Sequence, residues 1–318
     1  MENKLIPQSE SSLGVFGVIR ESFKTTSRNG KRLFSILLLV FLSYSQVDFL
    51  QEYTLAPVTN YFMWQLANHP NIVHDLLYNF DQTSYAVDTF KALRELVLLK
   101  LCIIEISSII TLIFLVATVC SSYEAYTAKV LGTKDLILKI FNSWNRSLLT
   151  SFYLGLLSLG TTFFYAIVIV ITSLLPVNSG ALLFLGVIAL SIPICYIYMA
   201  TVWMVSLIVS VLEEGSSGLT AIGRAAVLMK DKRLQASLMM VLFVLADRYV
   251  VLVAKVLASY GGSLSIELVT SIPFTNGFDC LLKLFMFVVY TVFYHEWKTS
   301  HDEKEGKGFY LPIVNVKA

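Results

Sequence analysis

Six long apolar stretches constrain this chain more than any other feature of its sequence. Each is long enough to cross the roughly 30 Å hydrocarbon core of a bilayer, which takes about 20 helical residues. Their approximate bounds are Leu33–Leu55, Leu96–Cys120, Leu148–Leu175, Ala181–Leu212, Leu234–Leu257 and Phe278–Tyr294. Helices satisfy all their own backbone hydrogen bonds in lipid. The sequence therefore predicts an all-α, polytopic integral membrane protein with six transmembrane helices.

Composition agrees with this class. The 318 residues are 56% hydrophobic and only 14% charged, and the mean hydropathy is +0.70, whereas about a quarter of a soluble domain is charged. The formal net charge is only +2. The basic residues form short flanks to the apolar stretches, so no nucleic-acid partner is expected.

The positions of the basic residues predict an orientation. The N-terminal segment, the second and fourth connections and the C-terminal tail hold 18 of the 24 lysines and arginines, whereas the alternate connections hold only Lys91 and Arg94. Basic residues accumulate on the cytosolic side of membrane helices. Both termini are therefore expected in the cytosol. The membrane itself is expected to be that of the endoplasmic reticulum or the Golgi, or the plasma membrane, and the sequence does not distinguish among these.

The same pattern predicts the division of the chain. Residues 1–32 form a cytosolic N-terminal segment, residues 33–295 a six-helix transmembrane domain, and residues 296–318 a cytosolic tail. The segment Ala56–Glu95 is expected to be the longest external loop. A cleavable signal peptide is not expected, because the first 32 residues are polar and mixed.

Three cytosolic segments share one layout, which suggests an internal repeat. The segments are Leu13–Ser35, Thr133–Ser151 and Ser217–Ser237, each predicted as an amphipathic helix, a basic turn and the start of a membrane helix. Three basic residues fall at equivalent membrane entries: Arg32, Arg146 and Arg233. We therefore predict three pseudo-repeats of an interfacial helix plus a helical hairpin. The alternative is that basic residues gather before any membrane helix.

Apolar residues recur at intervals of three and four in these segments, as a helix with one wet face requires. Phe16 and Phe23 belong to the apolar face of the first segment, with Leu13 and Ile19. The second apolar face holds Leu136, Ile137, Ile140, Phe141 and Trp144, with Lys139 and Asn142 facing water, and the third holds Leu219, Ile222 and Met229.

Two runs carry a resemblance to known families. The run Val211–Phe243 joins an acidic-glycine turn, a small-residue amphipathic helix, a basic turn and a membrane helix. It resembles a pattern in six-helix proteins that include the membrane domain attached to some bacterial glycerophosphodiesterases. The tail Val292–Gly306 further resembles uncharacterised plant multi-pass membrane proteins. The resemblance implies the six-helix plan but no activity, because the hydrolase of those enzymes is a separate soluble domain.

No motif of classical catalysis is present. The sequence lacks GxxxxGK[ST], GxGxxG, HExxH and GxSxG patterns. Its four cysteines are scattered through apolar runs, which favours packing over metal binding. We therefore predict no catalytic residues, no metal site and no cofactor, and hence a protein that is not an enzyme.

Charged residues within the apolar stretches are the candidate functional site, because ionisable groups in a membrane are expensive. The set is Asp48, Lys100, Glu105, Asp247, Arg248 and Lys255. Asp48 and Asp247 lie about 24 Å and 21 Å beyond the entries at Arg32 and Arg233. Two interpretations remain open: structural ion pairs, or a polar vestibule for a solute, ion or lipid headgroup.

These observations favour a non-enzymatic, membrane-organising or accessory role. The expected partners are membrane lipids and other membrane proteins, since three interfacial helices suit both. The alternative is a transporter of small solutes, ions or lipids that uses the buried charges.

Overall fold

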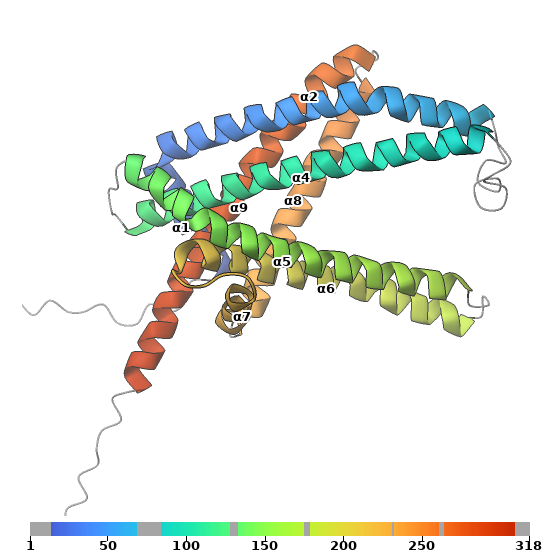
Figure 1. Ribbon diagram of the computed structural model, residues 1–318. Coiled ribbons are helices and arrows are strands. Elements are labelled where there is room, and N and C mark those ends of the chain that lie inside the picture. The colour runs from blue at the N-terminus through green and yellow to red at the C-terminus, as the bar shows by residue number, and fades with distance from the viewer. Residues whose placement is uncertain are drawn as a thin grey trace, which may run out of the picture. The chain divides into compact units, whose positions relative to one another are not determined.

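The computed structural model describes residues 14–68, 84–127, 133–174, 179–230, 232–260 and 264–308. All regular structure in these ranges is helical (Figure 1). The helices are α1 Val15–Arg28, α2 Gly30–Asn68, α4 Ser84–Thr127, α5 Thr133–Leu174, α6 Ser179–Leu212, α7 Leu219–Leu228, α8 Arg233–Tyr260 and α9 Leu264–Gly308.

Six of these helices contain stretches long and apolar enough to cross a membrane. The stretches are Gly30–Trp64, Phe90–Thr127, Ile137–Ile171, Ser191–Leu212, Arg233–Val256 and Pro273–Thr299. Each overlaps one of the six predicted apolar stretches. The all-helical class and the number of apolar helices are thereby confirmed, and they indicate a membrane-embedded protein.

Contacts between residues divide the chain into two compact units. The first unit comprises Met1–Ile36, Leu115–Val251 and Leu281–Ala318. The second comprises Leu37–Phe114 and Leu252–Cys280.

Small hydroxyl side chains line the contact between α5 and α6 in the first unit, where the two helices lie side by side (Figure 1). Ser210 donates a hydrogen bond to Ser147 over 3.4 Å, and Ser143 donates one to the carbonyl oxygen of Val211 over 3.3 Å. All three serines are buried. Such residues let helices approach closely in an apolar environment while their hydroxyls remain bonded.

Aromatic side chains join the other helices of the first unit. The buried Tyr290 on α9 donates a 2.8 Å hydrogen bond to the carbonyl oxygen of Ala236 on α8. The ring of Phe285 on α9 lies 4.4 Å from that of Phe23 on α1 and 6.1 Å from that of Phe243 on α8, between ring centroids. These contacts tie α1 and α8 to α9 through apolar area.

The core of the second unit lies between α2 and α4, which run side by side (Figure 1). Val47 and Leu55 on α2 pack with Ile103 on α4. The hydroxyl groups of Tyr44 and Thr111 are hydrogen-bonded to each other nearby. A polar link inside an apolar seam fixes which faces of the two helices meet.

The predicted loop Ala56–Glu95 was wrong at both ends. Helix α2 continues through Pro57 to Asn68, and α4 already begins at Ser84. A proline removes one backbone hydrogen bond, and the neighbouring turns keep theirs. The apolar and aromatic residues after Pro57 favour helix over loop next to lipid.

The predicted basic turn of the second segment was also wrong. Helix α5 is continuous from Thr133 to Leu174, and Arg146 lies inside it. Residues 142–150 contain neither glycine nor proline, so nothing in them ends a helix. The first and third segments do hold two helices each, because α1 ends before Gly30 and α7 ends at Leu228, before Arg233.

Two glycines shape the connection between α6 and α7. Gly215 has φ +88°, and Gly218 has φ +56° with ψ −128°, a conformation that side chains rarely allow. A Cβ atom on Gly218 would lie 3.0 Å from two ring carbons of Tyr153 on α5. The amide of Gly218 donates a 2.9 Å hydrogen bond to the Thr150 hydroxyl, which holds the turn against α5.

We expect Gly218→Ala to lower the free energy of unfolding by about 1–3 kcal/mol, because alanine would be strained in this conformation and its methyl group would press on Tyr153. Gly223→Ala is the matched control. Gly223 lies inside α7 with no described atom near its missing Cβ, so alanine should stabilise α7 by up to about 1 kcal/mol. Thermal unfolding in detergent measures both. An unchanged Gly218→Ala protein would contradict the account.

Candidate functional site

The most connected polar group in the first unit is the carboxylate of Glu213, the residue after the end of α6. It accepts hydrogen bonds from Tyr294 at 2.6 Å, from Arg224 at 2.8 Å and from Lys298 at 3.1 Å. Its side chain is only 12% exposed. Because Arg224 lies on α7 and the other two donors on α9, one carboxylate links three helices.

The main chain of Glu213 adds a fourth helix to this cluster. Arg146 on α5 donates a 2.8 Å hydrogen bond to the carbonyl oxygen of Glu213, which lies past the end of α6. The last carbonyls of a helix lack intrahelical partners and carry negative partial charge, so a guanidinium is a favourable cap. We call Arg146, Glu213, Arg224, Tyr294 and Lys298 the Glu213 cluster.

Opposing effects act on the ionisation of Glu213. Partial burial raises its pKa, but hydrogen bonds from Tyr294, Arg224 and Lys298 outweigh burial and hold the pKa below its ordinary value of 4.5. The carboxylate is therefore ionised at neutral pH and occupied by donors. Such a group is a poor proton acceptor, which favours a structural role over general-base chemistry.

Further ion pairs in the first unit join residues that are far apart in the sequence. Arg32 lies 3.4 Å from the buried carboxylate of Glu124 near the end of α4, and Lys232 lies 3.9 Å from Glu296 on α9. Beside the first pair, the Asn29 amide donates to the hydroxyl and the carbonyl oxygen of Ser121 at 2.7 and 3.1 Å. The junction of α1 and α2 is thereby fixed to α4.

The structure places the predicted entry residues differently from one another. Arg32 and Arg146 make the contacts above, whereas Arg233 is exposed at the first residue of α8 and Lys232 makes the contact there. Sequence reasoning missed the acidic partners Glu124, Glu213 and Glu296. Each lies near the end of the second, fourth or sixth apolar stretch, which is the signal that could have found them.

The predicted intramembrane charges of the second unit have dissimilar surroundings. Asp48 accepts a hydrogen bond from the Asn276 amide, and Lys100 donates a 3.1 Å hydrogen bond to Gln51. Glu105 and Lys255 are exposed on the protein surface, with no hydrogen-bond or ion-pair partner among the described residues. These four charges do not contact one another in the described part of the chain.

Asp247 and Arg248 lie in the first unit, next to each other on α8. The guanidinium of Arg248 is 3.6 Å from the Asp247 carboxylate, and Arg248 is exposed while Asp247 is partly buried. Neighbouring opposite charges can neutralise each other locally, which lowers the cost of placing them in a membrane stretch.

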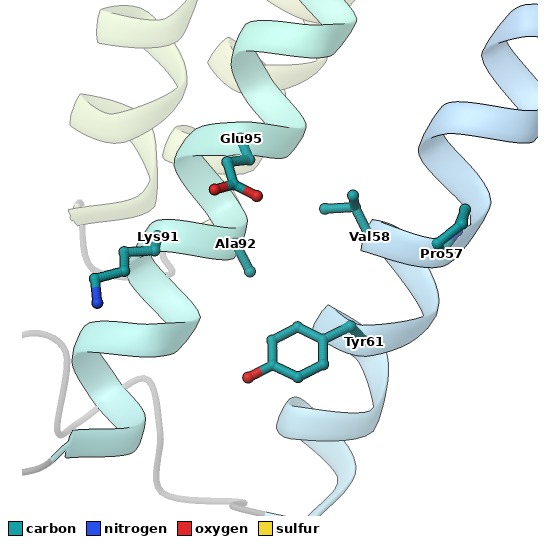
Figure 2. A pocket seen from close by; sticks show the side chains of 6 residues that line it. All are labelled: Pro57, Val58, Tyr61, Lys91, Ala92 and Glu95. Atoms are coloured by element: carbon teal, nitrogen blue, oxygen red, sulfur yellow. The ribbon is translucent and has the colours of Figure 1, made fainter.

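A pocket of about 360 Å³ lies between α2 and α4 in the second unit. Val58 and Ala92 point toward each other across it, and the Tyr61 ring points from α2 toward α4 (Figure 2). The remaining lining residues are Pro57, Lys91 and Glu95. The six predicted charges do not line it. Within the described ranges, no group of three His, Cys, Asp or Glu residues could hold a metal ion.

These features define a multi-helix membrane protein whose polar residues link its helices. The chain belongs to the family described as a domain of unknown function, DUF8558, which matches residues 7–310. No curated protein and no solved structure matches the chain. The resemblance to plant multi-pass proteins and to glycerophosphodiesterase membrane domains therefore finds no support in these comparisons.

We expect Glu213→Gln to destabilise the protein by about 1–3 kcal/mol, because a neutral amide replaces the charged acceptor of the hydrogen bonds from Tyr294, Arg224 and Lys298. Glu214→Gln is the matched control, since Glu214 is the exposed neighbour and loses the same charge. Thermal unfolding in detergent, with protease resistance of the α6–α7 connection, measures both variants. Equal thermal stability of the Glu213→Gln and Glu214→Gln proteins would contradict the stabilising role of the Glu213 cluster.

The lowered pKa of Glu213 predicts a loss of stability in acid. Because the folded-state pKa lies below the unfolded value of 4.5, the contribution of Glu213 is fully present above about pH 4.5 and disappears as the pH falls through the folded-state pKa. Unfolding measured between neutral pH and pH 3 should show a decline that is smaller in Glu213→Gln. An identical decline of stability in the wild-type and Glu213→Gln proteins would show that other titratable groups cause it.

Proposed function

We propose that this protein is a non-enzymatic membrane protein with an organising or accessory role toward lipids or other membrane proteins. The observation that carries this proposal is the use made of polar groups in the first unit. The Glu213 carboxylate accepts hydrogen bonds from donors of its own chain, and Glu124 and Glu296 form ion pairs with Arg32 and Lys232. Groups held in this way fix helices and are not free for reaction chemistry.

The recurring links support a three-hairpin architecture. In each case a basic residue near a membrane entry contacts the end of the next membrane helix: Arg32 with Glu124, Arg146 with the carbonyl oxygen of Glu213, and Lys232 with Glu296. The helices α2 and α4, α5 and α6, and α8 and α9 would form the three hairpins. We infer that the chain contains three pseudo-repeats closed by this link.

Exposed apolar side chains support interfacial positions for the segments before each hairpin. Ile137, Leu138 and Phe141 are exposed near the start of α5, as are Leu219 and Val227 on α7. Apolar residues exposed beside basic ones favour the boundary between headgroups and acyl chains. With the positive-inside pattern, this boundary is the cytosolic leaflet.

A transporter is the second candidate, favoured by the pocket between α2 and α4. Its lining combines the aromatic Tyr61 with Lys91 and Glu95, a mixture that can hold a small polar molecule. The exposed Glu105 and Lys255 offer further charges in the same unit.

Purified protein in liposomes distinguishes the two candidates. If the protein is an organiser, collapse of a pH gradient and scrambling of a fluorescent phospholipid should proceed no faster than in protein-free vesicles. A protein-dependent flux that Glu95→Gln abolishes, at unchanged thermal stability, would establish the transporter instead. Glu52→Gln is a matched control, since Glu52 is exposed on α2 and outside the pocket lining.

Both termini should face the cytosol, because the basic residues concentrate on that side of the membrane helices. Epitope tags at the two ends, digested by protease in sealed microsomes, should both be cleaved without detergent. Protection of either tag would contradict the orientation, and protection of only one would contradict an even number of membrane crossings.

A further inference from the structure

Helix α1 has a buried face and an opposite apolar face that the protein leaves exposed. Val18, Ser22 and Thr25 are buried, while Phe16 is 83% and Phe23 is 61% exposed. Residues seven apart lie on the same side of a helix. The two phenylalanines therefore form one stripe, roughly opposite the buried residues at about 100° per residue. The smaller, more polar side chains face the protein, whereas most of the area of the two phenylalanines is exposed, although the Phe23 ring also contacts Phe285.

A basic stripe runs beside the phenylalanines. Arg20, Lys24 and Arg28 recur at intervals of four residues and are all exposed. At about 100° per residue they lie between the phenylalanine stripe and the buried face, on one side only. Lys24 is 3.2 Å from Glu21, whereas Arg20 and Arg28 have no ion-pair partner among the described residues.

The position of α1 is fixed at the border of a membrane stretch. One residue, Asn29, separates Arg28 from Gly30, where the first candidate membrane span begins. Asn29 is bonded to Ser121, so this junction is held. The Phe23 ring contacts Phe285, which lies within the span Pro273–Thr299. The exposed phenylalanine stripe thus continues the apolar surface of the spans.

We propose that α1 is a binding site for anionic phospholipids, an assignment that rests on the organising role proposed above and names its lipid class. Phe16 and Phe23 enter the acyl-chain boundary, and Arg20, Lys24 and Arg28 hold the phosphate groups of anionic headgroups. Charge complementarity selects this occupant, because a row of cations beside apolar rings matches a leaflet that is negative outside and apolar beneath.

Hydrogen exchange of the full-length protein in lipid nanodiscs tests this assignment. We compare nanodiscs of phosphatidylcholine alone with nanodiscs in which one-third of the lipid is phosphatidylglycerol. Amides of α1 should exchange about tenfold more slowly in the anionic nanodiscs, because bound headgroups oppose local opening of the helix. Equal exchange in the two lipids, whether fast or slow, would overturn the proposal.

Two double variants make the comparison specific. Arg20→Gln/Arg28→Gln should abolish most of the difference between lipids, and it leaves the contact of Lys24 with Glu21 in place. Lys230→Gln/Arg233→Gln removes the same charge from the connection between α7 and α8, where both residues are exposed, and should preserve the difference at α1. If both double variants lose it equally, general surface charge explains the effect and α1 is not the site.

Two controls exclude other occupants. Soluble glycerol phosphate added to phosphatidylcholine nanodiscs should not protect α1; protection there would assign the site to free phosphate. Protection that follows the number of protein copies per nanodisc instead of the lipid charge would assign the stripe to a second copy of the chain. A flux in liposomes would disprove the organising role while leaving the lipid dependence of α1 measurable, so the two failures are distinguishable.

Discussion

The first unit depends most on the hydrogen bonds that the Glu213 carboxylate accepts. It gathers donors from α7 and α9, and its own carbonyl oxygen receives Arg146 from α5. In an environment of low dielectric constant, an ionised group without partners is very costly, and a fully bonded one holds its partners firmly. The end of α6 thereby becomes a joint at which four helices meet, and the Gly218 turn positions α7 to reach it.

The need of buried polar groups for hydrogen-bond partners explains other features of the described chain. Buried hydroxyls along α5 and α6 are bonded to each other, to a carbonyl oxygen or to a backbone amide. Near the end of α4, Asn29 donates a hydrogen bond to the carbonyl oxygen of Ser121, and Arg32 pairs with the Glu124 carboxylate. Polar groups that are satisfied within the chain hold the helices in place. The exposed Glu105 and Lys255 differ from them, because they have no hydrogen-bond or ion-pair partner within the described ranges.

Helix α1 shows how a surface can be polar toward the protein and apolar toward its surroundings. A soluble helix buries its large apolar residues, whereas α1 buries Ser22 and Thr25 and exposes Phe16 and Phe23. Exposed apolar area is costly in water, so we expect this inversion to be stabilised where the two rings meet lipid, as proposed above. In the proposed lipid site, the basic stripe beside the phenylalanines would select anionic headgroups.

The sequence alone determined the six membrane stretches, because about 20 consecutive apolar residues have few other uses than crossing a bilayer. It also showed the intramembrane charges and the basic entry residues, since these depend on local composition. The tertiary structure decided which groups meet. Nothing in the sequence around Arg32 indicates Glu124, some ninety positions away, and nothing around Arg233 indicates that its neighbour Lys232 meets Glu296 instead. The extension of α2 past Pro57 was likewise decided by packing and backbone hydrogen bonding, whereas the absence of glycine and proline from residues 142–150 already indicated the continuity of α5. The predicted apolar face of α1 contains Phe16 and Phe23, but periodicity cannot say whether such a face meets protein or lipid. That choice depends on which side chains the neighbouring helices have room to bury.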